Sequence, residues 1–266
     1  MTPRFHILGS SSSGNCAFLQ TENCKVLIDA GFSGRRTAEM LEEIGEKPDH
    51  LDAIFITHEH SDHINGLRGL SKWSHLRLFA NPFTAEASRR NLRRSPEWTL
   101  FESGATLTFR DLRVQTFSIP HDSHDPVGYV FSTGGDDLFK PLHRIGWVLD
   151  LGYAPESVKE RIRSVDTLVI EANHDRHLLR VDTKRPWSVK QRISGRHGHL
   201  SNEASCQLLE EVGERGASWK EVILGHLSGD CNSMAAVQEA FATLLQNPER
   251  NFPLRMVDGN GKLHDL

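Results

Sequence analysis

The chain has 266 residues, of which 38% are hydrophobic and 25% charged, as in an ordinary soluble globular protein. The net charge of −4 gives no global sign of nucleic-acid binding. No apolar stretch approaches the roughly 20 residues that a membrane span requires. Residues 1–4 lead directly into a strand-like segment, which leaves no room for a signal peptide. We therefore expect one cytoplasmic domain over residues 1–266, with no membrane contact.

The four cysteines are scattered along the chain and show no Cys-x-x-Cys spacing: Cys16, Cys24, Cys206 and Cys231. This pattern implies neither disulfide bonds nor a thiolate metal site. A reducing compartment is the default for such a chain.

The first part of the chain is predicted to alternate strands and helices. Strands are expected at 5–8, 16–21, 24–30, 51–57 and 76–80, with a serine-rich loop at 10–15. Helices are expected at 34–44 and 64–72, and from Pro82 to a point before Pro96. Ser33 is placed to begin the first helix, and Gly45 to end it.

The second part is richer in strands. They are predicted at 106–109, 112–119, 127–131, 145–149, 167–172, 221–225 and 254–258. Helices are predicted at 155–163, 202–212 and 233–245, a surface loop at 133–143, and an irregular basic segment at 173–196. Many strands with interspersed helices indicate an α/β fold in which helices cover sheets from outside.

One segment directly after an apolar strand carries four metal-capable side chains within six residues: His58, His60, Asp62 and His63. The first two histidines can reach one ion, and the aspartate and last histidine a second. Imidazole nitrogens and carboxylate oxygens suit zinc, manganese or iron, and the absence of thiolate argues against a closed structural zinc site. The alternative of a solvated histidine-rich loop is disfavoured, because several ligand types must coincide in order.

Three further ligand-type residues, His121, Asp150 and His226, each follow an apolar run. Taken singly, any one of them could be a capped or solvated residue. Together with the first segment they supply five histidines and two carboxylates, which fits two divalent ions sharing Asp150. Two such ions would hold a bridging hydroxide and stabilise both the attacking and the leaving oxygen of a phosphate displacement.

The order of these residues resembles that of the metallo-β-lactamase superfamily over about 200 residues. The resemblance implies an αββα sandwich, that is, two mixed β-sheets flanked by helices, with the metals at one edge. It also implies that Asp29 is not a ligand but orients the metal loop from behind. The alternative for Asp29 is a turn residue before Gly31.

Three segments, 168–172, 198–201 and 225–228, resemble stretches of the tRNA 3′-processing phosphodiesterases of the same superfamily. The resemblance implies that Glu171 and His199 protonate the leaving oxygen, with Asp62 as a further catalytic residue. An imidazolium held by a carboxylate can donate to a poor alkoxide leaving group. The alternatives are a solvated strand end for Glu171 and a helix-flanking position for His199.

A fuller resemblance, to the YycJ/WalJ-type bacterial exonucleases, rests on segments 8–16, 125–129, 171–175 and 198–202 and extends over nearly the whole chain. It implies metal-dependent hydrolysis of DNA, 5′-to-3′ on double-stranded substrates, using a metal-bridging hydroxide. The two ions are expected to be zinc or manganese ahead of iron. Nothing between Asp150 and His199 is long enough for the extra domain of RNA-processing β-CASP nucleases.

Several polar residues are candidates for substrate contact. Ser12 and Asn15 lie in the serine-rich loop, which could hold a terminal phosphate or be a tight turn, and Asn173 and His174 could line the cleft. A basic segment contains Arg192 and Arg196 together with Lys184, Arg185 and Lys190. A second basic group, on a predicted helix, consists of Arg89, Arg90, Arg93 and Arg94. Trp187 could stack on a base or pack. A solvated face is the alternative for either basic group.

The rival functions are a small-molecule (cyclic) phosphodiesterase, an RNA-processing nuclease of the same fold, a thioester hydrolase or lactamase, a mononuclear iron oxygenase, and a non-catalytic scaffold that binds nucleic acid. The Glu171 and His199 pair argues against acyl transfer, which has no need of that proton donor. The residues leave the native metal, DNA against RNA, the polarity of cleavage and the oligomeric state open.

Overall fold

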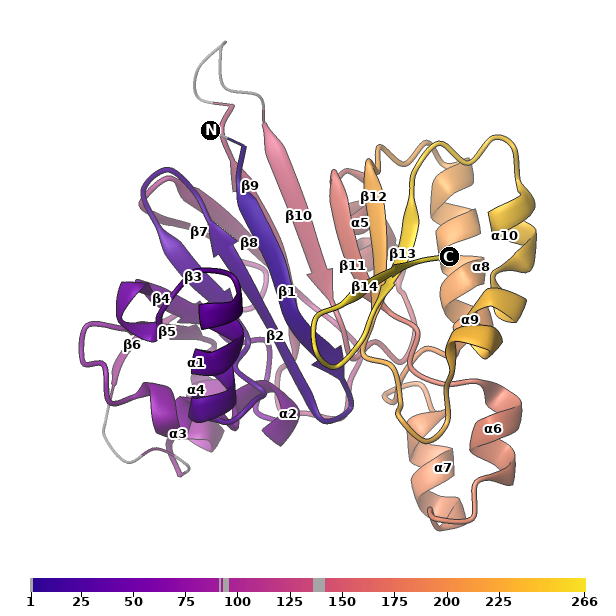
Figure 1. Cartoon of the computed structure of the whole chain (residues 1–266), viewed down its shortest axis with the longest axis horizontal. Helices are drawn as coiled ribbons and strands as arrows, with labels where there is room; N and C mark the ends of the chain where they lie inside the picture. Colours follow the sequence, from indigo (N-terminus) through magenta and orange to yellow (C-terminus); the bar gives the residue numbers. More distant parts are fainter. Residues whose placement is uncertain (1, 91, 93–95, 136–141) are drawn as a thin grey trace.

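The computed structural model describes residues 2–90, 92, 96–135 and 142–266. Two mixed β-sheets stand side by side with their inner faces in contact (Figure 1). The first has the order β1-β2-β3-β4-β5-β6, from Arg4–Ser11, Gly14–Gln20, Lys25–Ile28, Ala53–Phe55, Arg77–Ala80 and Glu97–Leu100. The second has the order β14-β13-β12-β11-β10-β9-β8-β7, from Leu263–Asp265, Leu254–Val257, Glu221–Gly225, Thr167–Glu171, His143–Val148, Val127–Thr133, Leu112–Ser118 and Thr106–Phe109.

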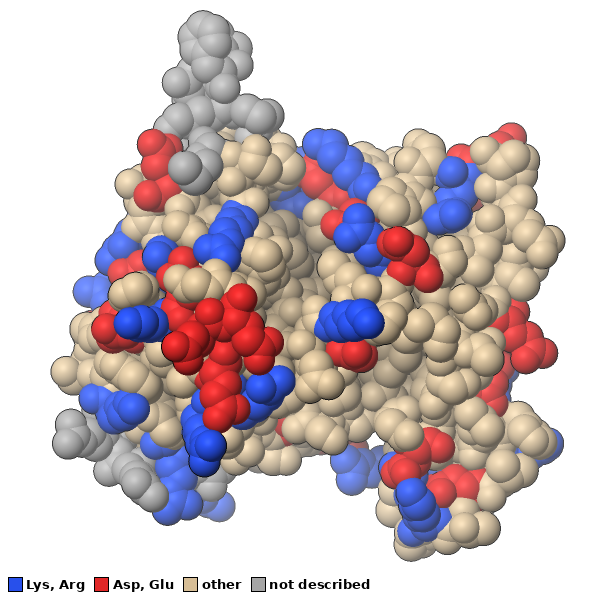
Figure 2. Space-filling model, viewed as in Figure 1, with Lys and Arg blue, Asp and Glu red and all other residues tan. Residues whose placement is uncertain are grey.

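Helices cover the outer faces of both sheets. The first sheet is covered by α1 (Gly34–Glu43), α2 (Ser61–Ile64), α3 (Leu67–Leu70) and α4 (Pro82–Arg89), with a 3-10 turn at Pro48–His50. The second is covered by α5 (Glu156–Arg163), α8 (Asn202–Glu214), α9 (Met234–Ala240) and α10 (Ala242–Gln246). Two short helices, α6 (Arg176–Val181) and α7 (Trp187–Ile193), project at one edge of the molecule (Figures 1 and 2). Every helix in these described ranges is too short or too polar to cross a bilayer.

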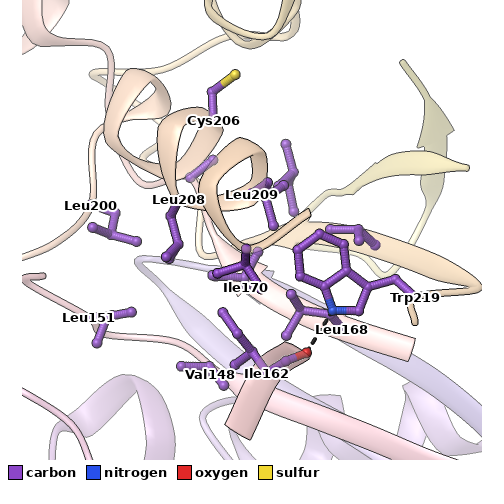
Figure 3. Close-up of a cluster of buried hydrophobic side chains, with 14 of the residues drawn as sticks. Val148, Leu151, Ile162, Leu168, Ile170, Leu200, Cys206, Leu208, Leu209 and Trp219 are labelled. Atoms are coloured by element: carbon purple, nitrogen blue, oxygen red, sulfur yellow. Dashed lines mark hydrogen bonds between the residues drawn. The ribbon is translucent and has the colours of Figure 1, made fainter. Parts of the chain in front are cut away.

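Alternation along the strands builds the three hydrophobic layers. In β11, Val169 points into the layer between the sheets, whereas Leu168 and Ile170 point into the layer under the helices. Figure 3 shows Ile170 beside Leu208 of α8 and Leu168 beside Trp219, whose Nε1 donates to the Ile162 carbonyl at 2.7 Å. Because both faces of the strand are buried, its sequence is a continuous apolar run.

The strand ends lie at one edge, which positions the site. Strands β3 and β4 pair in parallel, as do β10, β11 and β12, so their carboxyl ends point the same way within each sheet. A bridge between Ser11 and Leu227 ties the turn after β1 to the segment after β12. Residues that follow these strands are therefore brought together from both sheets.

Most predicted elements are present, and the differences have local causes. Helix α1 begins after Ser33, whose hydroxyl accepts from the Arg36 N–H at 3.2 Å, and it is followed by Gly45 at φ +78°. The helix predicted over 64–72 is present only as the shorter α3, because the helical backbone is interrupted after α2 at Asn65 and Gly66. There the Gly66 N–H donates to the Ala30 carbonyl at 2.7 Å, outside the helix ladder.

Several other predictions are corrected. The segment 173–196, expected to be irregular, contains α6 and α7, and the last predicted helix divides into α9 and α10 at Phe241. Strands β6 and β14 were not predicted. Helix α4 ends at Arg89 with Arg90 as its cap; Arg93 and Arg94, like residues 136–141 of the predicted surface loop, lie outside the described residues.

The serine-rich loop is shorter than predicted. Ser10 and Ser11 belong to β1, and Gly14 and Asn15 to β2, so that only residues 12–13 form the turn. A Cβ on Gly14 would lie 2.8 Å from the ring of Phe32, which explains the glycine at this strand start. The β1–β2 ladder extends into the predicted loop, because Ser10 pairs with Asn15.

Candidate metal centre

All seven residues predicted as metal ligands converge at this edge. Their ligand atoms fall into two adjacent groups, each within 4.8 Å: His58, His60 and His121, and then Asp62, His63, Asp150 and His226. Glu171 and His199 form a third group with Asp150 and His226. The Nε2 atom of His63 lies 2.9 Å from Asp150 Oδ2, and His226 Nε2 lies 3.2 Å from Asp62 Oδ2.

Two buried polar atoms in the groups have no hydrogen-bond partner among the described residues. These are His58 Nε2 and Asp150 Oδ2; the latter lies 2.9 Å from His63 Nε2 but outside hydrogen-bond geometry. An unpaired polar atom in a protein interior carries a desolvation cost of about 1–3 kcal/mol. A divalent cation would satisfy both atoms, and the nitrogen and oxygen donors suit zinc or manganese. The residues present therefore fit divalent metal binding.

The charge balance of the groups also favours cations. Burial would raise the pKa of Asp150, but His226 and His63 outweigh it and hold that pKa well below its usual range. Burial would lower the pKa of His226, but Asp150 and Asp62 outweigh it and raise that pKa to about 10. Burial, together with His63, lowers the pKa of His58 well below its usual range. The buried carboxylates thus stabilise positive charge in the centre, either as protonated histidine or as bound metal ions.

Three site residues adopt a left-handed backbone conformation at strand ends. Asp29, Asp150 and His226 have φ values of 58°, 60° and 55°, and Arg110 is the fourth non-glycine residue with positive φ in the described chain. This conformation costs about 1–2 kcal/mol per residue. Here it occurs one or two residues after β3, β10 and β12, at the edge where the ligand groups lie. Such strain persists because surrounding contacts hold it.

Asp29 is fully buried behind the metal loop. Its Oδ1 accepts from the Thr57 N–H at 2.9 Å, and its Oδ2 lies 2.9 Å from His63 Nδ1 and accepts from Trp147 Nε1 at 3.1 Å. Holding Nδ1 of His63 leaves Nε2 directed at Asp150. This arrangement supports the orienting role of Asp29 rather than a turn alone.

The His226 peptide is held on both sides by buried side chains. Ser10 Oγ accepts from the His226 N–H at 2.7 Å, and Asn173 Nδ2 donates to the His226 carbonyl at 2.9 Å. Gly225 permits the approach of Ser10, because a Cβ there would lie 2.7 Å from the hydroxyl oxygen. Ser10 also donates to Asn15 Oδ1 at 2.8 Å. Contacts from both sheets thus fix the left-handed turn that aims His226.

Glu171 and His199 form a buried carboxylate and a partly exposed imidazole. Glu171 Oε1 accepts from the backbone N–H groups of Leu151 and Leu200 at 2.6 and 2.8 Å. Its Oε2 lies 3.0 Å from His199 Nδ1 and 3.4 Å from His226 Nδ1. Burial would raise the pKa of Glu171, but His199 outweighs it and lowers that pKa to about 2. Glu171 stays ionised and holds Nδ1 of His199, whose side chain is 17% exposed.

The predicted substrate-contact residues divide by exposure. Ser12 is exposed at the turn after β1, whereas Asn15, Asn173 and His174 are buried. Asn15 Nδ2 lies 3.3 Å from His63 Nε2, and burial lowers the pKa of His174 to about 4. Asn173 contacts His226, and His174 contacts Asn173, so the prediction that they line the cleft stays a prediction, with both side chains almost fully buried.

The predicted basic segment is partly neutralised. Lys184 and Arg185 pair with Asp230, and buried Lys190 donates to backbone carbonyls of Arg180 and Asp182. Arg192 pairs with Asp122, beside His121. Arg196 is exposed, with its guanidinium 4.4 Å from the ring centroid of Tyr153.

The supporting residues Ser10, Thr57 and Trp147 were missed as site residues. Thr57 adjoins the metal loop in sequence, which is the one local signal of its role. Trp147 is fully buried in β10 and appears in the sequence only as part of an apolar run.

Comparison with known proteins gives a consistent result. The family described as "Beta-lactamase superfamily domain" matches residues 25–226. The chain is 38% identical over 234 residues to exodeoxyribonuclease WalJ of Streptococcus pneumoniae, covering 86% of this chain and 83% of that protein. It is 31% identical over 244 residues to exodeoxyribonuclease YycJ of Bacillus anthracis, covering 91% and 89%.

The solved structures support the fold. The metallo-β-lactamase fold protein YhfI from Bacillus subtilis superposes with a TM-score of 0.72 at 15% identity, covering 99% of both chains. At that identity the likeness concerns the fold alone. The predicted αββα sandwich is confirmed.

Proposed function

The chain belongs to the beta-lactamase superfamily, in the group that includes the exodeoxyribonucleases WalJ and YycJ, and we propose that it is a metal-dependent exonuclease hydrolysing phosphodiester bonds of DNA. The observation that carries the proposal is the pairing of His199 with buried Glu171 beside two ligand groups that share one edge. An acid held in this way suits an alkoxide leaving group, which needs a proton.

The ligand groups divide between two divalent ions. His58, His60 and His121 would hold one ion, and Asp62, His63 and His226 the other, with Asp150 between them. When bound, such a pair lowers the pKa of water and neutralises the charge that develops on phosphate. Zinc and manganese both accept this donor set.

The residues of the chain supply the proton. We assign His199 as the donor to the 3′ oxygen of the nucleotide that leaves, as the P–O bond breaks and the oxygen of water joins phosphorus. Glu171 keeps the imidazole oriented and stabilises its positive charge. The products are a nucleotide with a free 3′ hydroxyl and a shortened strand with a new 5′ phosphate, ready for another cycle.

The substrate is assigned as double-stranded DNA attacked from its 5′ end. The names of the relatives support DNA; the polarity and the duplex rest on the resemblance in sequence. Ser12 is exposed at the turn after β1, where its N–H donates to the Leu227 carbonyl at 3.4 Å, and its exposed position at this edge supports contact with a terminal phosphate. Arg192 and Arg196 supply positive charge beside the same edge.

The experiment uses protein loaded with manganese or zinc and DNA duplexes labelled at either end. Ordered release of mononucleotides from the 5′ end is expected, with weaker turnover of matched RNA. Cleavage of only bis(p-nitrophenyl) phosphate or cyclic nucleotides would overturn the proposal in favour of a small-molecule phosphodiesterase. An Asp150→Ala preparation controls for a contaminating nuclease.

A further inference from the structure

Residues 175–196, which contain α6 and α7 and which we call the arm, stand off the body at the edge that carries the metal centre (Figures 1 and 2). The arm lies between Glu171 and His199 in the sequence. It contains seven lysines and arginines and two aspartates, a formal charge of +5, so the rest of the chain carries −9 of the total −4. The arm thus brings a formal positive charge beside the proposed proton donor, part of which is offset by ion pairs with Asp122, Glu203 and Asp230.

One face of α7 is uncovered. Its exposed residues are Trp187, Ser188, Gln191 and Arg192. Lys190 is buried instead, and its ammonium donates to the backbone carbonyls of Arg180 and Asp182. Trp187 and Gln191 are four positions apart, as are Ser188 and Arg192, so each pair lies on one side of the helix, and the four residues together span about 140° of its circumference. Trp187 is 64% exposed. A tryptophan exposed to this degree at the start of a short helix makes little contribution to the core.

This face begins at the metal centre. Arg192 pairs with Asp122, the residue after His121. The helix end is anchored to the proposed acid, because the His199 N–H donates to the Ile193 carbonyl at 2.8 Å. Trp187 precedes Arg192 by five residues, which places it about 7.5 Å further along the helix axis. The face therefore leads outward from the centre.

We propose that this face of α7 is a binding surface for an unpaired nucleotide that flanks the scissile phosphodiester. Trp187 stacks on the base, and Arg192 exchanges its pairing with Asp122 for a phosphate. The charge of the arm favours a polyanion over an uncharged partner, and a flat aromatic ring accepts any base. The inference rests on the proposed function, because it extends the substrate of the same centre.

The test compares Trp187→Ala with Phe83→Ala, which removes another exposed aromatic side chain, 61% exposed, from α4. For each protein kcat/KM is measured on a DNA oligonucleotide and on bis(p-nitrophenyl) phosphate. The ratio of the two values should fall about tenfold for Trp187→Ala, and by less than twofold for Phe83→Ala. An unchanged ratio for Trp187→Ala would overturn the proposal.

A binding measurement separates this inference from the exonuclease assignment. Metal-loaded wild type and Trp187→Phe are titrated with a phosphorothioate oligonucleotide, and tryptophan fluorescence is followed. Quenching that is larger in the wild type supports stacking even if no DNA is cleaved, in which case only the proposed function fails. Equal quenching in both proteins contradicts stacking of Trp187 on a base.

Light scattering at matched concentrations tests whether a second copy of the chain, rather than a nucleotide, covers this face. A single molar mass for wild type and Trp187→Ala agrees with a nucleic-acid surface. A dimer that becomes a monomer on substitution would make the face a contact between copies and would overturn the proposal.

Discussion

The two halves of the metal centre are built in different ways. The first sheet contributes His58, His60, Asp62 and His63 from a single segment after β4 that runs into α2, whereas the second contributes His121, Asp150 and His226 from three separate strand ends. The first half is a local arrangement within six residues. The second exists only when the strands of the second sheet are paired and packed, so its geometry depends on the whole fold.

The backbone differs as well. No residue of the segment 58–63 has a positive φ, but Asp150 and His226 both do. Ser10, from the first sheet, helps to hold the strained His226 turn. A local motif can thus be recognised in isolation, whereas the second half needs supporting side chains from distant elements. The following predictions test that difference.

The largest effect is expected at the shared residue. Asp150→Ala should lower kcat on DNA by more than a thousandfold, because it removes the carboxylate that we propose is shared by the two ions. Circular dichroism should show an unchanged fold. A rate close to that of the wild type in this variant would contradict the shared position of Asp150.

The proposed acid should show a dependence on the leaving group. His199→Ala should slow DNA cleavage by about 10²–10⁴-fold, but should slow bis(p-nitrophenyl) phosphate much less, because nitrophenolate leaves without a proton. Steady-state rates on both substrates are the measurement. Equal losses on the two substrates would remove His199 as the proton donor.

The supports of His226 should affect metal binding. Ser10→Ala and Asn173→Ala should each weaken the binding of one ion by about 10–100-fold, because the left-handed turn loses a fixed partner. Competition with a fluorescent chelator measures the affinity of each ion. The matched control is Ser13→Ala, in the exposed turn of the same hairpin. Full affinity for both ions in the first two variants would show that they are not needed to aim His226.

The smallest effect is expected in the pH dependence of metal-free protein. With a pKa of about 10 in the folded state, His226 is protonated at neutral pH, above its usual value of 6.5. Its contribution to stability is fully present below pH 6.5 and is lost as pH rises through about 10. The thermal midpoint of metal-free protein should therefore fall between pH 7 and pH 10.

His226→Asn supplies the matched comparison for that pH effect. The variant lacks the titrating imidazole, so its midpoint should fall less over the same interval. Parallel curves for the two proteins would show that His226 does not carry the pH dependence.

The sequence predicted the ligands better than their supports. Histidine and aspartate after apolar runs are uncommon enough to indicate metal chemistry, so pattern and resemblance predicted the αββα fold, which is confirmed, and a ligand set whose side chains converge in the structure. Ser10, Thr57 and Trp147 are of residue types that occur everywhere, and their roles depend on contacts between elements far apart in the sequence.

The short elements were the least predictable part of the fold. Helices α6 and α7 have six and seven residues, too few for a clear apolar period. Their stability comes from tertiary contacts, such as the buried Lys190 ammonium on two carbonyls. Strand β6 is half exposed at a sheet edge, so its sequence lacks the apolar run that marks the central strands.

Anomalous diffraction from crystals grown with zinc or manganese tests the central claim most directly. Two peaks roughly 3.5–4 Å apart are expected, one among His58, His60 and His121 and the other beside His63 and His226, with Asp150 touching both. A single peak, or a second peak held without Asp150, would contradict a centre assembled from both sheets around one carboxylate.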